Sequence, residues 1–171
     1  HYAPSAQMPG LEAALLELSP HSRGHADIEA VLDRFAADPG EAGINTLRGR
    51  IKKLFEGQER LDDIFAALEA EGGQFATETL ATLRRMSPTS MRITFEQMRR
   101  GHRLDFDHVM QMEYRIVRRV MEGHDFFEGV RAQIIDKDRS PKWKPVALAD
   151  VSEADIARYF EPLGEEELSL P

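Results

Sequence analysis

Apolar residues recur every three or four positions along most of this chain, and this periodicity constrains its fold more than any other feature. The most regular run places Val109, Met112, Ile116 and Val120 on one face of a helix. Six further runs of the same kind span residues 11–18, 28–35, 47–55, 61–68, 75–86 and 91–98. Glycine or proline follows most of these runs, as expected where helices end. Alternating strand patterns are nearly absent, so the sequence predicts an all-α chain.

Capping residues predict where three of the helices begin. Ser87 precedes a proline, which suits an N-cap followed by the first helical position. Asp125 is followed three residues later by Glu128 and is predicted to cap the next helix, whose apolar face lies within 130–135. Ser152 and Asp155 form a variant of the capping box, with apolar neighbours placed for a hydrophobic staple. A short last helix is therefore expected over 152–160.

Length and charge restrict the classes of protein to which the chain can belong. Its 171 residues suit one domain, and we expect a single helical unit over 1–171. Lys and Arg number 22 against 30 Asp and Glu, so the net charge of −8 disfavours nucleic acid as a partner. No apolar run approaches the roughly 20 residues of a membrane-spanning helix, so no membrane partner is expected. The acidic end, 165–167, is expected to fray.

The cysteine and histidine content restricts the reactions and metal sites that the chain can support. The chain has no cysteine, which removes disulfides, thiolate metal sites and cysteine nucleophiles. His21 and His25 are four residues apart, but they lie in a predicted loop and have no acidic partner at a zinc-ligand spacing, so no metal site is expected. His124 and Asp125 could form half of an acid/base relay, although the capping role of Asp125 is the favoured interpretation.

Nine arginines fall between residues 84 and 119. A solvated helix face with ion pairs to the acidic remainder is the favoured interpretation. A nucleic-acid surface and an approach for a phosphorylated ligand are the alternatives. Glu113 lies in the apolar run over 109–120 and comes closest to the surroundings of a general acid. A structural role is the favoured interpretation, in which a mostly buried Glu113 would need Arg92 or Arg99 as its partner. No phosphate-binding glycine motif and no nucleophile elbow occurs, so the residues alone indicate no assembled catalytic site.

Four short motifs occur in a fixed order along the second half of the chain. They are SPTS at 87–90, MEYR at 112–115, GHDFFEGVRA at 123–132 and IDKDRSPKWKP at 135–145. Together they closely resemble the C-terminal region of the 3-hydroxyisobutyryl-CoA hydrolases, a branch of the crotonase (enoyl-CoA hydratase/isomerase) superfamily. The strongest resemblance covers 87–145, and a weaker match of the helical pattern extends over nearly the whole chain.

The resemblance implies that the chain is the helical C-terminal portion of an α/β crotonase-like fold. The implied reaction is hydrolysis of 3-hydroxyisobutyryl-CoA to the free acid and CoA in valine breakdown, with no cofactor because CoA is part of the substrate. The first residue is His1 rather than Met, and we expect the catalytic residues to lie upstream of it, with none in this chain. The implied partners are the acyl-CoA substrate and an N-terminal crotonase core, and the resemblance leaves a homo-oligomer open. A bacterial relative would be cytoplasmic and a eukaryotic one mitochondrial.

The resemblance also suggests what these helices contribute to the enzyme. In relatives, the helix that begins here at Asp125 lies near the CoA site, and a basic residue at its end approaches the nucleotide. Gln133 departs from the general crotonase pattern, in which phenylalanine is common, but Lys137 is the best candidate for substrate binding. Trp143 is expected to anchor its loop by packing rather than to serve as a platform for the ligand.

Two other functions remain open at this point. The chain could belong to an enoyl-CoA hydratase or isomerase, which shares the crotonase fold but carries out a different reaction. It could also be a stand-alone helical protein-interaction module that uses its arginine-rich face.

Overall fold

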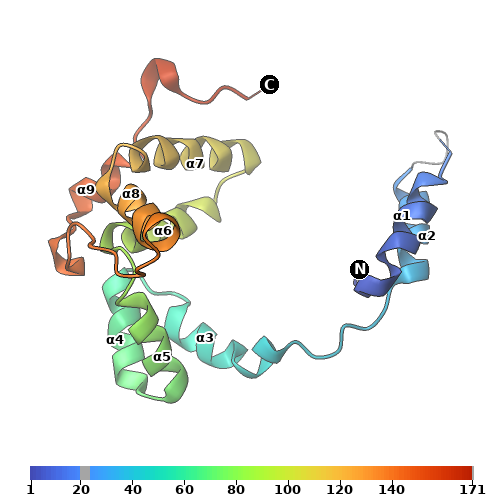
Figure 1. Cartoon of the computed structure of the whole chain (residues 1–171), viewed down its shortest axis with the longest axis horizontal. Helices are drawn as coiled ribbons and strands as arrows, with labels where there is room; N and C mark the ends of the chain where they lie inside the picture. The colour runs from blue at the N-terminus through green and yellow to red at the C-terminus, as the bar shows by residue number, and fades with distance from the viewer. Residues whose placement is uncertain (20–23, 171) are drawn as a thin grey trace. The chain divides into compact units, whose positions relative to one another are not determined.

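The computed structural model describes residues 1–19 and 24–170, and within them helices are the regular secondary structure present (Figure 1). No strand occurs in this part of the chain, so the prediction of an all-α chain is confirmed. The residues divide into two compact units, His1–Lys53 and Leu54–Pro171, which are described separately. The single unit expected over 1–171 stays a prediction.

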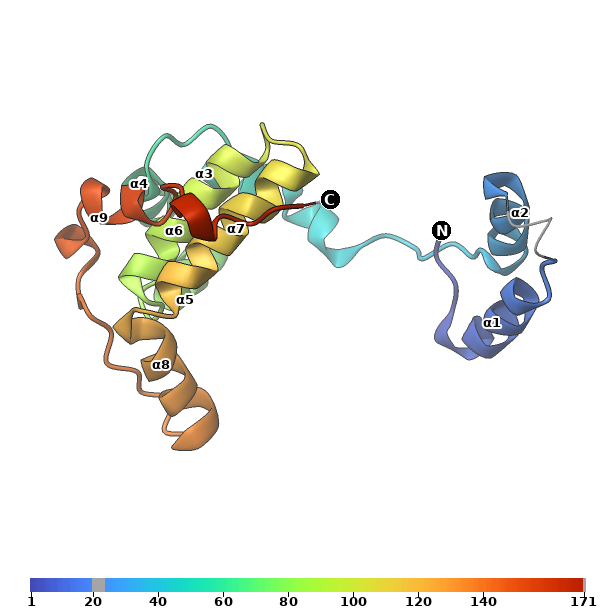
Figure 2. The same ribbon diagram turned by 90° about the horizontal axis from the view of Figure 1, so that it is seen from above.

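The first unit is built around a pair of helices, α1 (Met8–Leu16) and α2 (His25–Phe35), which lie side by side (Figure 2). Leu11 and Val31 are their buried residues. The approach is close at Gly10, where a Cβ atom would lie 3.2 Å from the ring of Phe35. The backbone nitrogen of Ala37 donates to the carbonyl of Tyr2 at 2.8 Å, which holds the start of the chain against the end of α2.

The remaining helices follow in chain order. They are α3 (Arg48–Phe55), α4 (Leu61–Glu71), α5 (Gln74–Leu83), α6 (Pro88–Gly101), α7 (Phe106–Val120), α8 (His124–Val130) and α9 (Glu153–Arg158). A π-helical turn, Arg131–Ile135, extends α8. Short 3-10 turns occupy Ser5–Gln7, Gly43–Thr46, Leu148–Asp150 and Gly164–Glu166.

One hydrophobic core of the second unit joins Leu54 to the hairpin of α4 and α5. Gly72 ends α4 with a φ of 64°, a left-handed conformation that glycine adopts at little cost, and this allows the chain to reverse. Leu54 and Leu68 are the largest fully buried side chains, at 2% and 1% exposure. Each contributes roughly 1.5–3 kcal/mol by its removal from water. This core supports α6, which packs on α4.

A second core joins α6, α7 and α9. Its buried members are Ile93, Met112, Ile116, Val151, Ile156 and Phe160. Met112 and Ile116 confirm the apolar face predicted for α7, which Val109 and Val120 continue as half-buried residues. The contact of α6 with both α7 and α9 brings segments from distant parts of the sequence together.

Two of the three predicted caps are confirmed, and one is wrong. The hydroxyl oxygen of Ser87 accepts a hydrogen bond from the backbone nitrogen of Ser90 at 3.0 Å, and that of Ser152 accepts from Asp155 at 3.1 Å. The cap of α8, however, is Gly123, and Asp125 lies inside the first turn. The carboxylate of Asp125 binds other segments instead of its own helix, as described below.

We expect Ser152→Ala to lower the free energy of unfolding by about 1 kcal/mol, because an N–H at the start of α9 loses its acceptor. Urea unfolding of the wild type and the variant measures this difference. Ser169→Ala is the matched control, since Ser169 is exposed and lies outside any helix. Equal losses in the two variants would show that the cap does not stabilise α9.

Candidate functional site

Asp125 joins three of the four sequence motifs at one point. Its Oδ2 accepts a hydrogen bond from Ser87 Oγ at 2.5 Å, and its Oδ1 accepts from the backbone nitrogen of Lys144 at 2.8 Å. The Asp125 side chain is only 10% exposed, and Ser87 is buried at 5%. The start of α6, the start of α8 and the loop over 136–145 are therefore held together by one carboxylate.

His124 also contacts this carboxylate, with 3.0 Å between its Nδ1 and Asp125 Oδ1. The same Oδ1 binds the backbone of Lys144, and Oδ2 binds Ser87, so both oxygens serve structural bonds. The predicted capping role of Asp125 is wrong, because Gly123 is the N-cap of α8 and the Asp125 carboxylate binds other segments. The geometry gives the pair a structural role in place of an acid/base relay.

Arg131 is the centre of a second cluster, which the sequence interpretation did not identify. Its guanidinium donates two bonds to Glu128, at 2.9 and 2.8 Å. It also donates to Asp136 at 2.6 Å and to Asp138 at 2.7 Å. The spacing of Glu128 and Arg131, three residues apart on a helix, could have indicated the first pair. The two aspartates come within reach because the helix widens into the π-helical turn.

The charges of this cluster stabilise one another. Hydrogen bonds from the Arg131 side chain and from the backbone of Lys142 lower the pKa of Glu128 from 4.5 to about 2. Hydrogen bonds from Arg131 and from the backbone of Ser140 lower the pKa of Asp138. The carboxylates in turn raise the pKa of Arg131, with Glu128 contributing most. All three groups are therefore charged at neutral pH.

The lowered pKa of Glu128 predicts a pH dependence of stability. A carboxylate with a folded-state pKa of about 2, below its ordinary 4.5, stabilises the fold above pH 4.5 and loses this contribution as the pH falls toward 2. We therefore expect the wild type to be more stable than Glu128→Gln at pH 6, and the difference to shrink by pH 3. Urea unfolding at both values measures it, with Glu165→Gln as an exposed control. A difference that does not change with pH would contradict the assignment.

The loop after the π-helical turn has an unusual backbone. Lys137 and Arg139 have φ angles of 57° and 54°, in the left-handed region that residues other than glycine seldom adopt. Two backbone bonds hold this shape, from Asp136 to the carbonyl of Arg131 at 2.8 Å and from Arg139 to that of Ala132 at 3.0 Å. Lys137 is exposed, and its ammonium forms no ion pair with any residue that the structure describes. It is therefore available to a ligand, as is required of the predicted substrate-binding residue.

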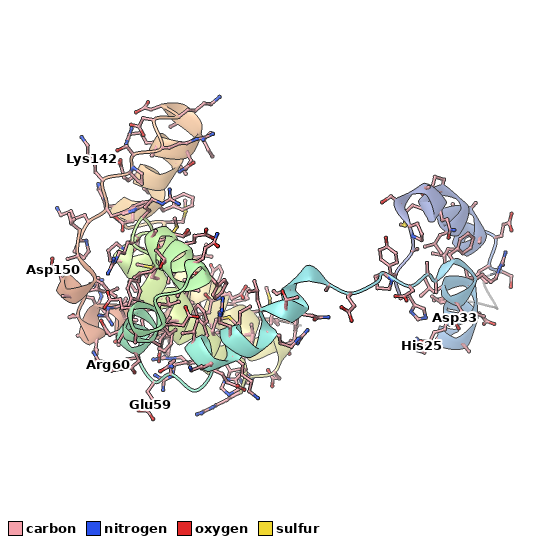
Figure 3. All side chains as sticks on the ribbon, turned by 90° about the horizontal axis from the view of Figure 1, so that it is seen from below. His25, Asp33, Glu59, Arg60, Lys142 and Asp150 are labelled. Carbon is pink, nitrogen blue, oxygen red and sulfur yellow. The ribbon has the colours of Figure 1, made fainter. Side chains whose placement is uncertain are left out.

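Trp143 fixes the return of this loop to the rest of the unit. Its Nε1 donates to the carbonyl of Arg85 at 2.8 Å, which ties the loop to the turn that follows α5. Its ring lies against α8 at Gly129, where a Cβ atom would be 3.4 Å from Cη2. These contacts support the prediction that Trp143 is a packing anchor. Figure 3 shows Lys142, its neighbour, on the part of the loop that runs beside α8.

Glu113 does not behave as predicted. It is exposed, and its partner is Gln97, whose Nε2 donates to it at 3.3 Å. Arg92 is bound instead to Asp62, at 3.2 Å, and to the carbonyl of Leu148. The apolar run of α7 favoured burial, but Glu113 is exposed and binds α6 through the side chain of Gln97.

The arginines between 84 and 119 mostly form structural ion pairs, as the favoured interpretation predicts. The pairs are Arg84 with Glu69, Arg92 with Asp62, Arg99 and Arg100 with Glu96, Arg115 with Glu167, and Arg118 with Glu166. The last two pairs connect α7 to the acidic end of the chain. Glu166 and Glu167 are thus bound to α7, whereas the expected fraying of 165–167 stays a prediction.

No metal site is found in the described part of the chain, where no three His, Asp or Glu side chains are grouped to hold an ion. Of the two histidines considered as metal ligands, His21 lies outside the described residues. The ring of His25 lies 3.5 Å from the carboxylate of Glu29. None of the described helices is long and apolar enough to cross a membrane.

Two pockets in the described part of the second unit contain no catalytic set. One of about 510 Å³ lies between the start of α4, α6 and α9 and includes Arg60 (labelled in Figure 3), Arg92 and Arg99. Arg60 is paired with Glu153 and Arg92 with Asp62, so these charges are already compensated. A smaller pocket of about 60 Å³ lies beside Asp125 and Tyr159. Neither pocket combines an activated nucleophile with a base.

Comparison with known proteins gives the class to which this chain belongs. Residues 1–160 match the family described as enoyl-CoA hydratase/isomerase, and the chain belongs to that family. The predicted resemblance and the helical portion of a crotonase fold are thus confirmed. The family match removes the support for a stand-alone interaction module.

Two relatives show which members of this family the chain resembles. The chain is 37% identical to the mitochondrial 3-hydroxyisobutyryl-CoA hydrolases of Gallus gallus, over 177 residues, and Homo sapiens, over 179. Each alignment covers 99% of this chain and 45% of the relative, so the chain spans about half the length of these proteins.

Two solved structures are also similar. A carnitinyl-CoA dehydratase from Mycobacterium thermoresistibile has a TM-score of 0.84 and 29% identity, and the match covers 99% of this chain and 46% of that one. An enoyl-CoA hydratase from Rhodobacter sphaeroides 2.4.1 has a TM-score of 0.81 and 34% identity, with 98% and 46% covered.

Proposed function

We propose that this chain is the C-terminal helical region of an acyl-CoA thioester hydrolase that acts on 3-hydroxyisobutyryl-CoA. The observation that carries this proposal is the 37% identity over 99% of the chain to relatives named for that activity. The contacts of Asp125 and Arg131 support it, because they account for residues in the motifs on which the resemblance rests.

In this proposal, the region over 124–144 forms one wall of the CoA site, and Lys137 contacts the substrate. An exposed ammonium with no carboxylate partner suits the phosphate groups of CoA. The protein needs no cofactor, since CoA belongs to the substrate.

The catalytic groups are proposed to lie in the part of the intact protein that this chain does not span. Hydrolysis of a thioester requires hydrogen-bond donors placed at the developing oxyanion, and a carboxylate to handle the water or the acyl group. The described residues contain no such set. The carboxylates nearest the proposed CoA site, those of Asp125 and Glu128, are engaged in structural bonds.

A hydratase or isomerase reaction is the second candidate, and it is favoured by the names of the two similar solved structures. The intact protein distinguishes the two when it is given 3-hydroxyisobutyryl-CoA and crotonyl-CoA in parallel. We expect a free thiol to appear from the first substrate. Loss of the enoyl absorbance from the second substrate, with no thiol released from either, would favour the hydratase and overturn the hydrolase.

The compartment is proposed from the relatives as well. The animal hydrolases are named as mitochondrial, so a eukaryotic source would place the protein in mitochondria. A bacterial source would place it in the cytoplasm.

A further inference from the structure

The loop over 136–144 separates its charges by sign. Its acids, Asp136 and Asp138, both bind Arg131. Its bases are all exposed, and none of them forms an ion pair among the described residues: Lys137, Arg139, Lys142 and Lys144. In the sequence, by contrast, the charges over 136–139 alternate as Asp-Lys-Asp-Arg, so Lys137 and Arg139 each have an acid beside them.

Arg131 is the residue that makes this separation possible. Its planar guanidinium presents several N–H groups in fixed directions, so it can bind Glu128 with two bonds and still reach both aspartates. A lysine could provide the charge but not this geometry. The bonds draw the carboxylates toward the π-helical turn.

The pairing of the aspartates with Arg131 matters because of Coulomb's law. A carboxylate within a few ångströms of an ammonium offsets most of its attraction for an approaching anion. Asp136 and Asp138 stay exposed, at 50% and 43%, but their carboxylates are bound to Arg131 and not to the neighbouring cations. The four cations of the loop are therefore left unpaired among the described residues. An anion with several phosphate groups is the ligand that such a surface fits.

We propose that Arg131 is a positioning residue for substrate binding: it binds the loop's two aspartates, so that the loop's four cations remain unpaired and are available to the phosphate groups of the acyl-CoA. This inference rests on the proposed function. Arg131 does not itself contact the substrate or take part in the chemistry.

The test compares the intact wild-type protein with Arg131→Met, using 3-hydroxyisobutyryl-CoA and the matching pantetheine thioester, which lacks the nucleotide. We expect KM for the CoA thioester to rise about tenfold, equivalent to 1.4 kcal/mol, with kcat unchanged. KM for the pantetheine thioester stays at the wild-type value. A merely structural role would change both substrates alike, and that result, or no change in either, would overturn the proposal.

Arg131→Lys and Arg118→Met complete the comparison. The lysine variant keeps the charge beside Glu128, and we expect a smaller but measurable rise in KM for the CoA thioester alone. It also decides the question if Arg131→Met fails to fold. Arg118 binds only Glu166 in the described residues, on another helix, so its loss is expected to leave both KM values unchanged.

Calorimetric binding of CoA separates this inference from the proposed function. If the intact protein hydrolyses no thioester, the proposed function fails, but CoA affinity still tests Arg131. Wild-type affinity about tenfold above that of Arg131→Met supports the positioning role. Equal affinities, or no binding of CoA by the wild type, overturn it.

Discussion

Asp125→Ala is expected to lower the free energy of unfolding by about 2–4 kcal/mol, among the largest effects of any single substitution in the second unit. The variant leaves the buried hydroxyl of Ser87 and the backbone nitrogen of Lys144 without their acceptor. A buried polar group without a partner costs about 1–3 kcal/mol. Urea unfolding of the intact protein, followed by a signal from this region, measures the loss.

Two further variants test whether the loss of stability comes from the buried bonds of the Asp125 carboxylate. Asp125→Asn keeps one carbonyl oxygen, so it is expected to lose less than alanine does. Asp33→Ala removes a carboxylate that is 70% exposed and bound to His1, and a change below about 1 kcal/mol is expected. A loss at Asp125 no greater than that at Asp33 would contradict the role of Asp125 as the junction of the motifs.

Trp143→Ala is expected to cost about 2–3 kcal/mol. Replacement of a fully buried tryptophan costs 3–5 kcal/mol, and Trp143 is half-buried, so the lower range applies. The variant loses the contact with Gly129 and the hydrogen bond to the carbonyl of Arg85. Because this bond ties the loop to the turn that follows α5, trypsin should then cleave faster after Lys137 and Arg139.

Conservative changes separate the two contributions of Trp143. Trp143→Phe keeps an aromatic ring and loses the hydrogen bond, so a cost of about 1 kcal/mol is expected. Gly129→Ala is expected to be tolerated, since its Cβ would meet the Trp143 ring at an ordinary contact distance of 3.4 Å. Unchanged stability and unchanged proteolysis of Trp143→Ala would show that the indole is not an anchor.

The helices could be predicted from the sequence because their signals are local. The apolar run of α7 needs only the 3.6-residue period, and Met112 and Ile116 are buried as it requires. Ser152 similarly caps α9 through a residue three positions away. Val151 and Ile156, the predicted staple, are both buried in the same core.

The site was less predictable, because its bonds connect distant residues. Asp125 has the local sequence of an N-cap, but its carboxylate binds Ser87, 38 residues earlier, and the backbone of Lys144, 19 residues later. A capping signal carries no information about such partners. The role of Arg131 likewise depends on a π-helical turn, which brings Asp136 and Asp138 to its guanidinium.

The sequence predicted that the surface arginines form ion pairs, but it did not predict which residues are their partners. The arginines of 84–119 form ion pairs as expected, but Glu113 takes Gln97 as its partner, and the acidic end binds α7. Long charged side chains can reach several partners at similar cost, so the fold decides among them. By contrast, the family resemblance drew on four ordered motifs and was confirmed by the match over 1–160.

The measurement that tests the central claim most directly is the position of ¹⁸O after the intact protein has acted on 3-hydroxyisobutyryl-CoA in H₂¹⁸O. Hydrolysis of the thioester places one new oxygen from water in the carboxylate of the released acid, together with an equal amount of free CoA. We predict this result. Label in the hydroxyl group of a product still bound to CoA, with no free CoA, would show reversible dehydration and would contradict the hydrolase.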